Sequence, residues 1–407
     1  MLTAHHMSTL GKVLGDIRVL GDQIDWIRLW FTGGIPMVAM VIGSLWVPLQ
    51  SRTAIFACVY GTVGGISITA GYHRLWAHRA YSAGTFLKIA LAITGASAGQ
   101  GSIRTWCRDH RAHHRYTDTD KDPYSAHKGL FYSHYGWVVV RRKPEQTGRV
   151  EIQDLSNDYI IMWQREHYLM LLFLTAYVFP TVLCGLMFDD FAGGFIWASC
   201  VRLFVIQQGT FCVNSLAHWA GDQPFANKLS PRNSWFVALV TWGEGYHNFH
   251  HEFPVDYRNG IRWYQWDPTK WFIWLCEKVN LASDLKRFPE NEIQKGQFQQ
   301  IERRMELQRK EISWGTPIDQ LPAWSFGEYI EYVKSGRCLL VVDDVVHNVE
   351  DFVGHHPGGE KYLLEHIGKD ATKLFHGGGI HAHSNAAENL LSTMRLARIV
   401  DSDHRQS

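Results

Sequence analysis

The sequence lacks an excess of either charge. Its 40 lysine and arginine residues are balanced by 39 aspartate and glutamate residues, so the formal net charge at pH 7 is only +1. A protein that binds DNA or RNA needs a basic excess to neutralise phosphates and release counterions. The composition therefore predicts no nucleic-acid partner.

Paired cysteines are also missing. The 407 residues contain seven cysteines, an odd number, scattered along the chain without a CxxC pair. A disulfide framework or a cysteine-based zinc site would need regularly spaced pairs. We therefore expect free thiols in or beside a reducing compartment.

The first thirty residues lack a secretory signal. No apolar core follows a basic start, and Asp16, Asp22 and Asp25 interrupt the stretch. We expect residues 1–30 to form a cytosolic segment. Insertion into a membrane then has to come from internal stretches.

Long apolar stretches, by contrast, are abundant. Four of them have the ~20 residues that a helix needs to cross a ~30 Å hydrocarbon core. Their bounds are residues 31–49, 53–72, 168–188 and 191–214. Because very short connections join the members of each pair, the pattern predicts two helical hairpins and four transmembrane helices.

The charges in the loops predict the topology. The segment 73–167 is rich in Arg and Lys, whereas the two short connections carry one Arg and two Asp. Under the positive-inside rule, that segment, both termini and everything after residue 214 are cytosolic. Residues 84–103 are apolar but contain Lys88, and we expect an interfacial helix there, because a fifth crossing would separate the histidines described below. Arg202, inside the fourth span, is expected to face the bundle or to snorkel.

Histidine is the residue type that forms recurring motifs in this chain. Residues 108–114 read RDHRAHH, which places three imidazoles at i, i+3 and i+4 on one face of a helix. HxxHH recurs at 247–251, and HxxxxH stands at 73–78. Any one motif alone fits ordinary solvated or buried histidines. The full set is His73, His78, His110, His113, His114, His218, His247, His250 and His251. Nine histidines are too many for one tetrahedral zinc and suit two octahedral metals with open positions.

The pattern changes after residue 254. Residues 255–289 mix aromatic and charged side chains, which suits a cytosolic cap on the membrane surface, so the membrane domain is expected to cover 31–289. Residues 290–320 begin with a strongly charged stretch whose apolar residues have helical spacing, which predicts a linker helix. Farther on, β-branched runs at 338–342 and 345–349 flank an Asp-Asp turn and predict a hairpin in a small α+β domain.

Residues 355–360 read HHPGGE. The proline fixes the backbone and the glycines permit a sharp turn, so His356 can project from a loop into an apolar pocket. The run GKDATKLF and an HS pair follow within about thirty residues. Together these motifs resemble cytochrome b5 over residues 321–402. The resemblance implies a haem b bound by His356 and His383, with His381 as the alternative to the latter.

The membrane part resembles the acyl-CoA delta-9 desaturases of the stearoyl-CoA type, over about residues 25–290. The matching runs are GYHRLWAHR at 71–79, RDHRAHH at 108–114, NSLAH at 214–218 and GEGYHNFHHEFP at 243–254. A desaturase followed by its own cytochrome b5 is similar to the fungal form of this family. The implied fold is a membrane all-α domain, with four transmembrane helices and a cytosolic helical cap around a dimetal site, plus a small α+β cytochrome b5-like domain.

The resemblance also implies an activity. Members insert a cis double bond into saturated acyl-CoA, stearoyl-CoA or palmitoyl-CoA, in the endoplasmic reticulum membrane. They use two non-haem irons, O2 as co-substrate, and electrons from an NADH-cytochrome b5 reductase that here would pass through the fused haem domain. Neutral imidazole ligands leave the irons more cationic than carboxylates would, which suits oxidation of an unactivated methylene.

Residues of the substrate site follow from the same resemblance. Positions that contact CoA in the family hold Arg108, Asp109, Arg141 and Arg142, positions that line the kinked acyl tunnel hold Gln100, Trp106, Trp137 and Thr210, and the position that reaches one metal through a water holds Asn214. An interfacial Trp or a surface Arg needs no substrate to explain it. Asp109 and Glu244 are also candidates for orienting the imidazoles.

Two glycines bear on the length of the acyl chain. Gly61 and Gly65 lie i, i+4, twelve and eight residues before His73, where side-chain bulk limits the tunnel in the family. Small residues there predict a deep tunnel and a preference for stearoyl-CoA over palmitoyl-CoA. The same spacing is a common packing device between membrane helices.

Two other functions fit parts of the sequence. Membrane hydroxylases use similar histidine motifs and sometimes carry a cytochrome b5 domain, and an alcohol product would identify one. A membrane-anchored haem electron carrier would explain the C-terminal domain but not nine clustered histidines.

Overall fold

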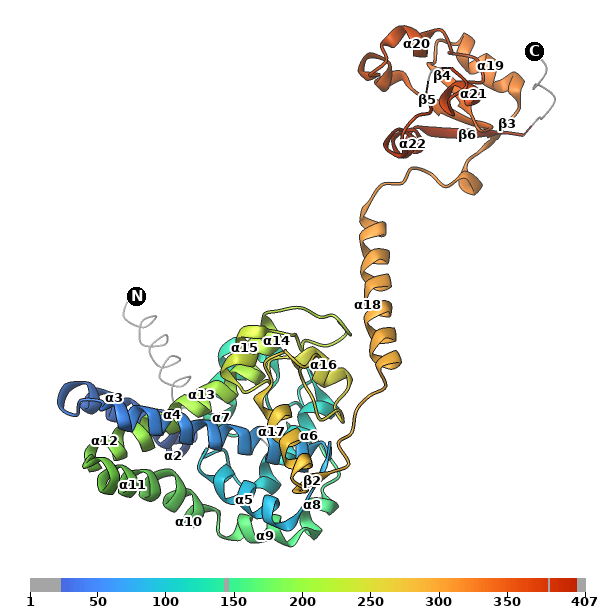
Figure 1. Cartoon of the computed structure of the whole chain (residues 1–407). Coiled ribbons are helices and arrows are strands. Elements are labelled where there is room, and N and C mark those ends of the chain that lie inside the picture. Colours follow the sequence, from blue (N-terminus) through green and yellow to red (C-terminus); the bar gives the residue numbers. More distant parts are fainter. Residues whose placement is uncertain (1–22, 143–145, 380, 401–407) are drawn as a thin grey trace, which may run out of the picture. The chain divides into compact units, whose positions relative to one another are not determined.

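The computed structural model describes residues 23–142, 146–379 and 381–400. The chain divides after Glu302 into two compact units. In the described residues the first unit is almost wholly helical, and the second contains a four-stranded sheet (Figure 1). This is the predicted combination of a membrane all-α domain and a small α+β domain, and it is confirmed.

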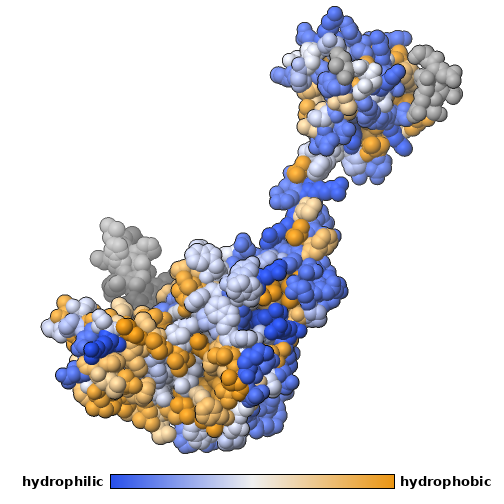
Figure 2. Space-filling view, in the orientation of Figure 1, coloured by the Kyte–Doolittle hydropathy of each residue, from blue (hydrophilic) through white to orange (hydrophobic). Residues whose placement is uncertain are grey.

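Four helical segments of the described chain are long and apolar enough to cross a membrane: 26–46, 51–77, 168–188 and 191–219. They are built from α2 Trp26–Leu29, η1 Trp30–Gly34 and α3 Ile35–Trp46; α4 Ser51–Ile66 and η2 Ser67–Ala77; α10 Tyr168–Leu172, η6 Phe173–Val178 and α11 Phe179–Phe188; and α12 Phe191–Phe195, η7 Ile196–Val201, α13 Arg202–Asn214 and α14 Leu216–Trp219. Figure 2 shows apolar side chains gathered over the region of α10–α12. The protein is therefore a multi-pass membrane protein.

The second and fourth spans are longer than the sequence predicted. They contain 27 and 29 residues, about 40 Å of helix at 1.5 Å per residue, whereas the hydrocarbon core is ~30 Å thick. Measured from the short connections at which these helices start, His73 and His218 lie in the excess length. Both histidines therefore lie at the same end of the two hairpins, opposite the short connections.

A shorter apolar helix follows the second span. Helix α5 covers Thr85–Ala96, which is less than the predicted stretch 84–103 and too short to cross the membrane. The helix ends before residue 103 because Gly99 and Gly101 have positive φ angles of 64° and 92°. This left-handed backbone conformation stops a helix. As expected, it is not a fifth crossing.

Arg202 faces the helix bundle rather than the lipid. Its side chain is buried, and its guanidinium donates to the carbonyl oxygens of Ala198, Ser97 and Ala176. The guanidinium also lies 4.8 Å from the ring centre of Tyr60. These contacts join the second, third and fourth spans to the end of α5.

The remaining elements of the first unit form a cap of short helices. They are α6 Ile103–Tyr116, η3 Ala126–Lys128, η4 Tyr132–Gly136, α7 Trp137–Val139, α8 Gln153–Asn157, α9 Tyr159–Glu166, α15 Trp235–Val240, α16 His247–Glu252 and α17 Pro268–Lys278, with the paired strands β1 Ser82–Ala83 and β2 Ala282–Ser283. Helix α18, Glu290–Glu311, lies within the segment 290–320 for which a charged linker helix was predicted, and begins at the same residue.

The second unit contains a mixed sheet with strand order β3-β6-β5-β4. Strands β4 Leu339–Val342 and β5 Val345–Asn348 form the predicted hairpin. Asp343 and Asp344 turn it with φ angles of 53° and 58°, a left-handed pair that matches the twist of the strands. The other elements are η8 Ile318–Gln320, β3 Ala323–Trp324, α19 Phe326–Lys334, η9 Glu350–His355, α20 Glu360–Leu364, α21 Thr372–Phe375, α22 Asn385–Ser392 and β6 Arg395–Ile399.

Candidate metal centre

The nine predicted histidines converge into two groups. Group A contains His73, His78, His110, His114 and His250, and group B contains His113, His218, His247 and His251. Within each group, one possible ligand atom per residue lies within 4.8 Å of all the others. All nine side chains are buried or half-buried, although they come from four separate stretches of the chain: residues 73–78, α6, α14 and α16.

The two HxxHH motifs divide between the groups in opposite ways. On α6, the i, i+4 pair His110 and His114 enters group A and His113 enters group B. On α16, the i, i+4 pair enters group B and the i+3 residue His250 enters group A. Each helix therefore serves both groups, which places the groups side by side. His73 and His78 complete group A, and His218 completes group B.

His73 and His78 share a face because the helix is widened there. Residues 67–77 form a π-helix, and His78 N–H donates to the carbonyl oxygen of His73 at 3.0 Å. This backbone hydrogen bond from residue i+5 to residue i widens the turn, so residues five apart lie on the same face of the helix. In an α-helix the same two side chains would point in different directions. Such widened turns recur at functional sites.

The facing nitrogen atoms have the spacing of metal ligands. In group A three Nε2–Nε2 pairs lie 2.8 to 3.0 Å apart, and in group B three pairs lie 3.1 to 3.2 Å apart. Ligands at right angles around a metal, with bonds of ~2.1 Å, have donor atoms about 3.0 Å apart. The geometry of both groups thus fits a six-coordinate metal ion.

The surroundings of several imidazoles favour their neutral form. Burial, together with mutual repulsion among the ring charges, lowers the pKa of His110, His114 and His250 well below the usual range for histidine. The pKa of His247 and His251 is lowered in the same way. The neutral form keeps a lone pair on one ring nitrogen, which is the form that binds a metal.

Two of the histidines have a carboxylate next to Nδ1, the ring nitrogen that faces away from the other histidines. His113 Nδ1 lies 2.8 Å from Asp122 Oδ1, with the geometry of a hydrogen bond. His73 Nδ1 lies 2.7 Å from Glu244 Oε2, off the line of a good hydrogen bond, so this contact is electrostatic. Such partners of the outer ring nitrogen orient a ligand and fix which nitrogen faces the metal.

Glu244 belongs to a buried charge network. Arg74, 1% exposed, donates to Glu244 Oε1 at 2.8 Å and to Asp267 Oδ1 at 2.9 Å. Asn259 Nδ2 donates to Glu244 Oε2 at 2.7 Å. Burial alone would raise the pKa of Glu244, but His73 and Arg74 hold it at about 2, so the carboxylate stays ionised.

A second histidine pair lies in the C-terminal unit. The ring centres of His356 and His383 are 6.4 Å apart, and two imidazoles bound at ~2 Å on opposite sides of one iron would have centres about 6 Å apart. His356 Nδ1 lies 3.0 Å from Gly359 O, and His383 Nδ1 lies 3.0 Å from Phe375 O. These contacts leave both Nε2 atoms available for the metal. The pair fits the two axial positions of a haem.

A family model described as fatty acid desaturase matches residues 51–281, and one described as cytochrome b5-like haem/steroid binding domain matches residues 325–400. The chain belongs to the fatty acid desaturase family. Iron and haem are the cofactors that these two families imply, and the enzyme is an oxidoreductase.

Named relatives agree with the match. The desaturase is 47% identical to acyl-CoA desaturase 1 of Saccharomyces cerevisiae over 94% of this chain and 75% of that protein. It is 48% identical to a probable acyl-CoA desaturase of Schizosaccharomyces pombe, over 92% and 77% of the two chains. Stearoyl-CoA desaturase 5 of Bos taurus is 36% identical over 65% of this chain and 81% of that protein, so similarity to that relative covers a smaller share of this chain.

Three of the four predicted CoA contacts of the desaturase lie together. Asp109 pairs with Arg108 at 2.6 Å and with Arg142 at 2.8 Å. No contact described in the structure joins Asp109 to a histidine. Arg141 is exposed, and its backbone N–H donates to Gln23 O. Asp109 therefore arranges two guanidinium groups, whereas the orienting role that the sequence also allowed belongs to Glu244 and Asp122.

Three of the predicted tunnel residues form one hydrogen-bonded chain. Trp106 Nε1 donates to Gln100 Oε1 at 3.1 Å, and Gln100 Nε2 donates to Thr210 Oγ1 at 2.8 Å. The Trp106 ring also stacks on His110 with 4.9 Å between ring centres. The chain of contacts thus begins at group A and leads to α13. Trp137 packs against Phe211 on the same helix, with 5.6 Å between ring centres.

The two glycines of the second span make different contacts. A Cβ atom at Gly61 would lie 3.6 Å from Arg202 Cγ and 3.7 Å from Ile206 Cδ1, which is ordinary van der Waals contact. A Cβ atom at Gly65 would lie 2.4 Å from the ring of Trp242. Gly65 therefore permits a close approach of an indole, while Gly61 faces the fourth span across a gap that admits a methyl group.

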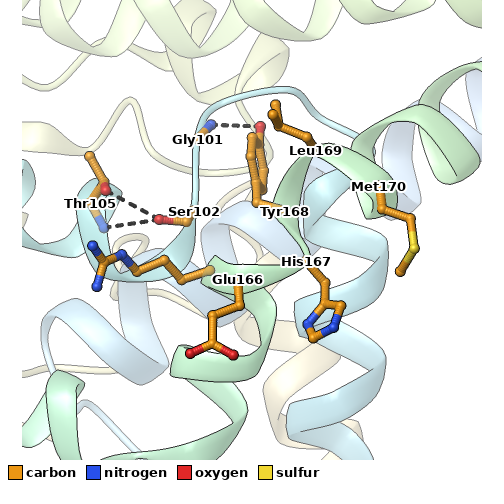
Figure 3. Close-up of a pocket in the computed structure, with 9 residues that line it drawn as sticks. Gly101, Ser102, Thr105, Glu166, His167, Tyr168, Leu169 and Met170 are labelled. Atoms are coloured by element: carbon orange, nitrogen blue, oxygen red, sulfur yellow. Dashed lines mark hydrogen bonds between the residues drawn. The ribbon is translucent and has the colours of Figure 1, made fainter.

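A cavity of about 420 Å³ lies between the start of α6 and the start of α10 (Figure 3). In it Gly101 N–H donates to Tyr168 Oη at 2.8 Å. None of the predicted metal, haem or substrate residues lines this cavity. It is separate from the histidine groups.

Asp122 was not anticipated from the sequence, and neither was the Arg74 network. The acidic run TDTDKDP, residues 117–123, follows the second histidine motif in the sequence after two residues. A carboxylate within ten residues of a histidine motif is the signal that could have indicated it.

Proposed function

We propose that this desaturase converts saturated fatty acyl-CoA, with stearoyl-CoA and palmitoyl-CoA as substrates, to the cis-delta-9 monounsaturated acyl-CoA. The convergence of nine imidazoles into two adjacent groups carries this proposal. The names of the relatives, acyl-CoA and stearoyl-CoA desaturases, support the substrate class.

The reaction removes one hydrogen from each of two neighbouring methylenes. One O2, two electrons and two protons are consumed, and the products are one carbon–carbon double bond and two water molecules. Two non-haem irons, bound by the histidines of groups A and B, would supply the oxidising chemistry when O2 is present. Group B has one histidine fewer than group A. Asn214, at the end of α13 and four residues before His218, is proposed to complete group B through a water.

The protein's own side chains position the substrate. Arg108, Arg141 and Arg142 are proposed to bind the phosphates of CoA, where guanidinium groups form strong charge-assisted hydrogen bonds. The hydrogen-bonded chain of Trp106, Gln100 and Thr210 is proposed to line the bend of the acyl tunnel, because it runs from a metal ligand to the fourth span. Trp137, which packs against Phe211 of α13, would line the same bend.

Electrons are proposed to enter through the C-terminal unit. His356 and His383 would hold a haem b that an NADH-cytochrome b5 reductase reduces, and the haem would pass electrons one at a time to the irons. The reductase is cytosolic in this scheme, so the histidines and both termini face the cytosol from the endoplasmic reticulum membrane. The proposed domains are residues 1–30, 31–289, 290–320 and 321–402.

The decisive test is product analysis. Purified protein receives stearoyl-CoA, O2, NADH and the reductase, and the acyl products are separated by gas chromatography with the double-bond position determined. We expect octadecenoate with a cis double bond at carbon 9. A hydroxylated product would identify a hydroxylase, and no product with a reducible haem would identify an electron carrier.

The acyl-chain preference tests Gly61. We expect wild-type protein to prefer stearoyl-CoA in an equimolar mixture with palmitoyl-CoA, because each extra buried methylene contributes ~0.8 kcal/mol. Gly61→Phe should shift the product ratio toward the shorter chain by up to about tenfold, the value of two methylenes. Gly61→Ala is the matched control, since a Cβ atom fits there. An unchanged ratio in folded, iron-loaded Gly61→Phe would assign Gly61 to helix packing.

A further inference from the structure

His218 does not touch a carboxylate directly. Its Nδ1 lies 2.7 Å from Ser230 Oγ, and Ser230 Oγ donates to Asp118 Oδ1 at 2.5 Å. Asp118 Oδ2 also accepts from the backbone N–H of Ser230 at 2.6 Å. Asp118 and Ser230 are 112 residues apart in the sequence, so the contact depends wholly on the fold.

The order of the contacts fixes the direction of each hydrogen bond. An ionised carboxylate only accepts, so the single hydroxyl hydrogen of Ser230 points to Asp118. Ser230 Oγ must then accept from His218, which places the ring hydrogen of His218 on Nδ1. The lone pair of His218 is left on Nε2, and this atom faces His247 Nε2 at 3.1 Å inside group B.

The loop that contains Asp118 also contacts a second histidine, His113, through Asp122. Asp122, which contacts His113, accepts from the backbone N–H of Asp118 at 3.1 Å through its other oxygen. Asp118 has a φ angle of 64°, a left-handed conformation that Asp adopts more readily than most residues. One turn of chain thus supports a ligand on α6 and a ligand at the end of the fourth span.

We propose that Ser230 and Asp118 are positioning residues that orient His218 and hold its lone pair toward group B. This inference rests on the metal centre proposed above. Group B has four histidines and group A has five. Loss of one well-oriented ligand should therefore lower the metal affinity of group B more than the same loss would lower that of group A. Partners of this kind typically contribute 10- to 100-fold to metal affinity.

The test uses the full-length protein loaded with ferrous iron. Iron affinity is measured by competition with a chelator, and the two irons are compared by Mössbauer spectroscopy. Ser230→Ala should weaken the binding of one iron about 10-fold and change the spectrum of that iron only, with haem content unchanged. Ser230→Thr keeps the hydroxyl and should restore both readouts.

Two further variants separate orientation from folding. Ser234→Ala removes a hydroxyl four residues away that caps α15 and touches no histidine, so it should lower thermal stability without changing iron affinity. Asp118→Asn keeps a residue suited to the left-handed backbone but supplies a weaker acceptor, and it should also weaken one iron. Wild-type affinity and spectrum in Ser230→Ala or Asp118→Asn would overturn the inference. Equal loss in Ser234→Ala would overturn it too. Wild-type protein without two irons would instead refute the metal centre itself.

Discussion

Replacing His110 by alanine is expected to abolish desaturation and to lower the non-haem iron content while leaving the haem spectrum intact. His110 Nε2 lies 2.8 Å from His78 Nε2 and belongs to group A. Removal of its imidazole takes away a ligand and opens a space beside Trp106. Loss of an outer partner alone costs 10- to 100-fold, so removal of a ligand itself should reduce turnover by more than about 100-fold.

The measurement is iron per haem by elemental analysis, together with product formation from stearoyl-CoA. His250→Ala should behave in the same way, because His250 Nε2 faces both His73 and His114. His167→Ala is the matched control, since His167 is exposed, belongs to neither histidine group, and contacts Trp163 through that residue's carbonyl oxygen and ring. Stoichiometric zinc in a fully active protein would contradict the assignment of iron.

Replacing His356 by alanine is expected to remove the haem and stop NADH-driven turnover. An axial ligand cannot be supplied by a methyl group. The non-haem iron content should remain at the wild-type value, because His356 and His383 lie in the second unit whereas groups A and B lie in the first. Added soluble cytochrome b5 should restore part of the rate by delivering electrons to the intact irons.

A comparison of His383→Ala with His381→Ala identifies the second haem ligand. His383 stacks on Phe375, with 4.4 Å between ring centres, and has its Nδ1 beside a carbonyl oxygen, whereas His381 is exposed. We expect haem loss in His383→Ala and retention in His381→Ala, measured by the Soret absorbance per protein. Full NADH-driven activity of His356→Ala without an added carrier would show that electrons take another route.

Local patterns predicted the parts of this protein that depend on neighbours in sequence. The bounds of the third span follow from an uninterrupted apolar run, the start of α18 follows from a charged stretch with helical spacing of its apolar residues, and the hairpin around Asp343 follows from two β-branched runs and a turn. The histidines of α6 were placed on one helical face because i, i+3 and i+4 always share a face. The family resemblance then indicated the chemistry.

Patterns in sequence predicted less well where glycines or a widened helix intervene. The stretch 84–103 is mostly apolar, yet the helix ends at Ala96, because two glycines beyond it, Gly99 and Gly101, adopt positive φ angles. The second span continues to Ala77, past the predicted end at residue 72, since burial in the cap stabilises a π-helix that polar residues alone would not predict.

The nine clustered histidines could be named from the order of residues along the chain, because they lie in short motifs with helical spacing. The proposed haem pair, His356 and His383, followed from the resemblance to cytochrome b5. The division of the nine histidines into groups of five and four required the fold, since α6 and α16 each send ligands to both groups. The contacts behind the ligands also required it: Glu244 reaches His73 from 171 positions away, and Ser230 reaches Asp118 across 112. A hydrogen bond to a ring nitrogen depends on distances of a few tenths of an ångström, and only the packing of distant segments sets such distances.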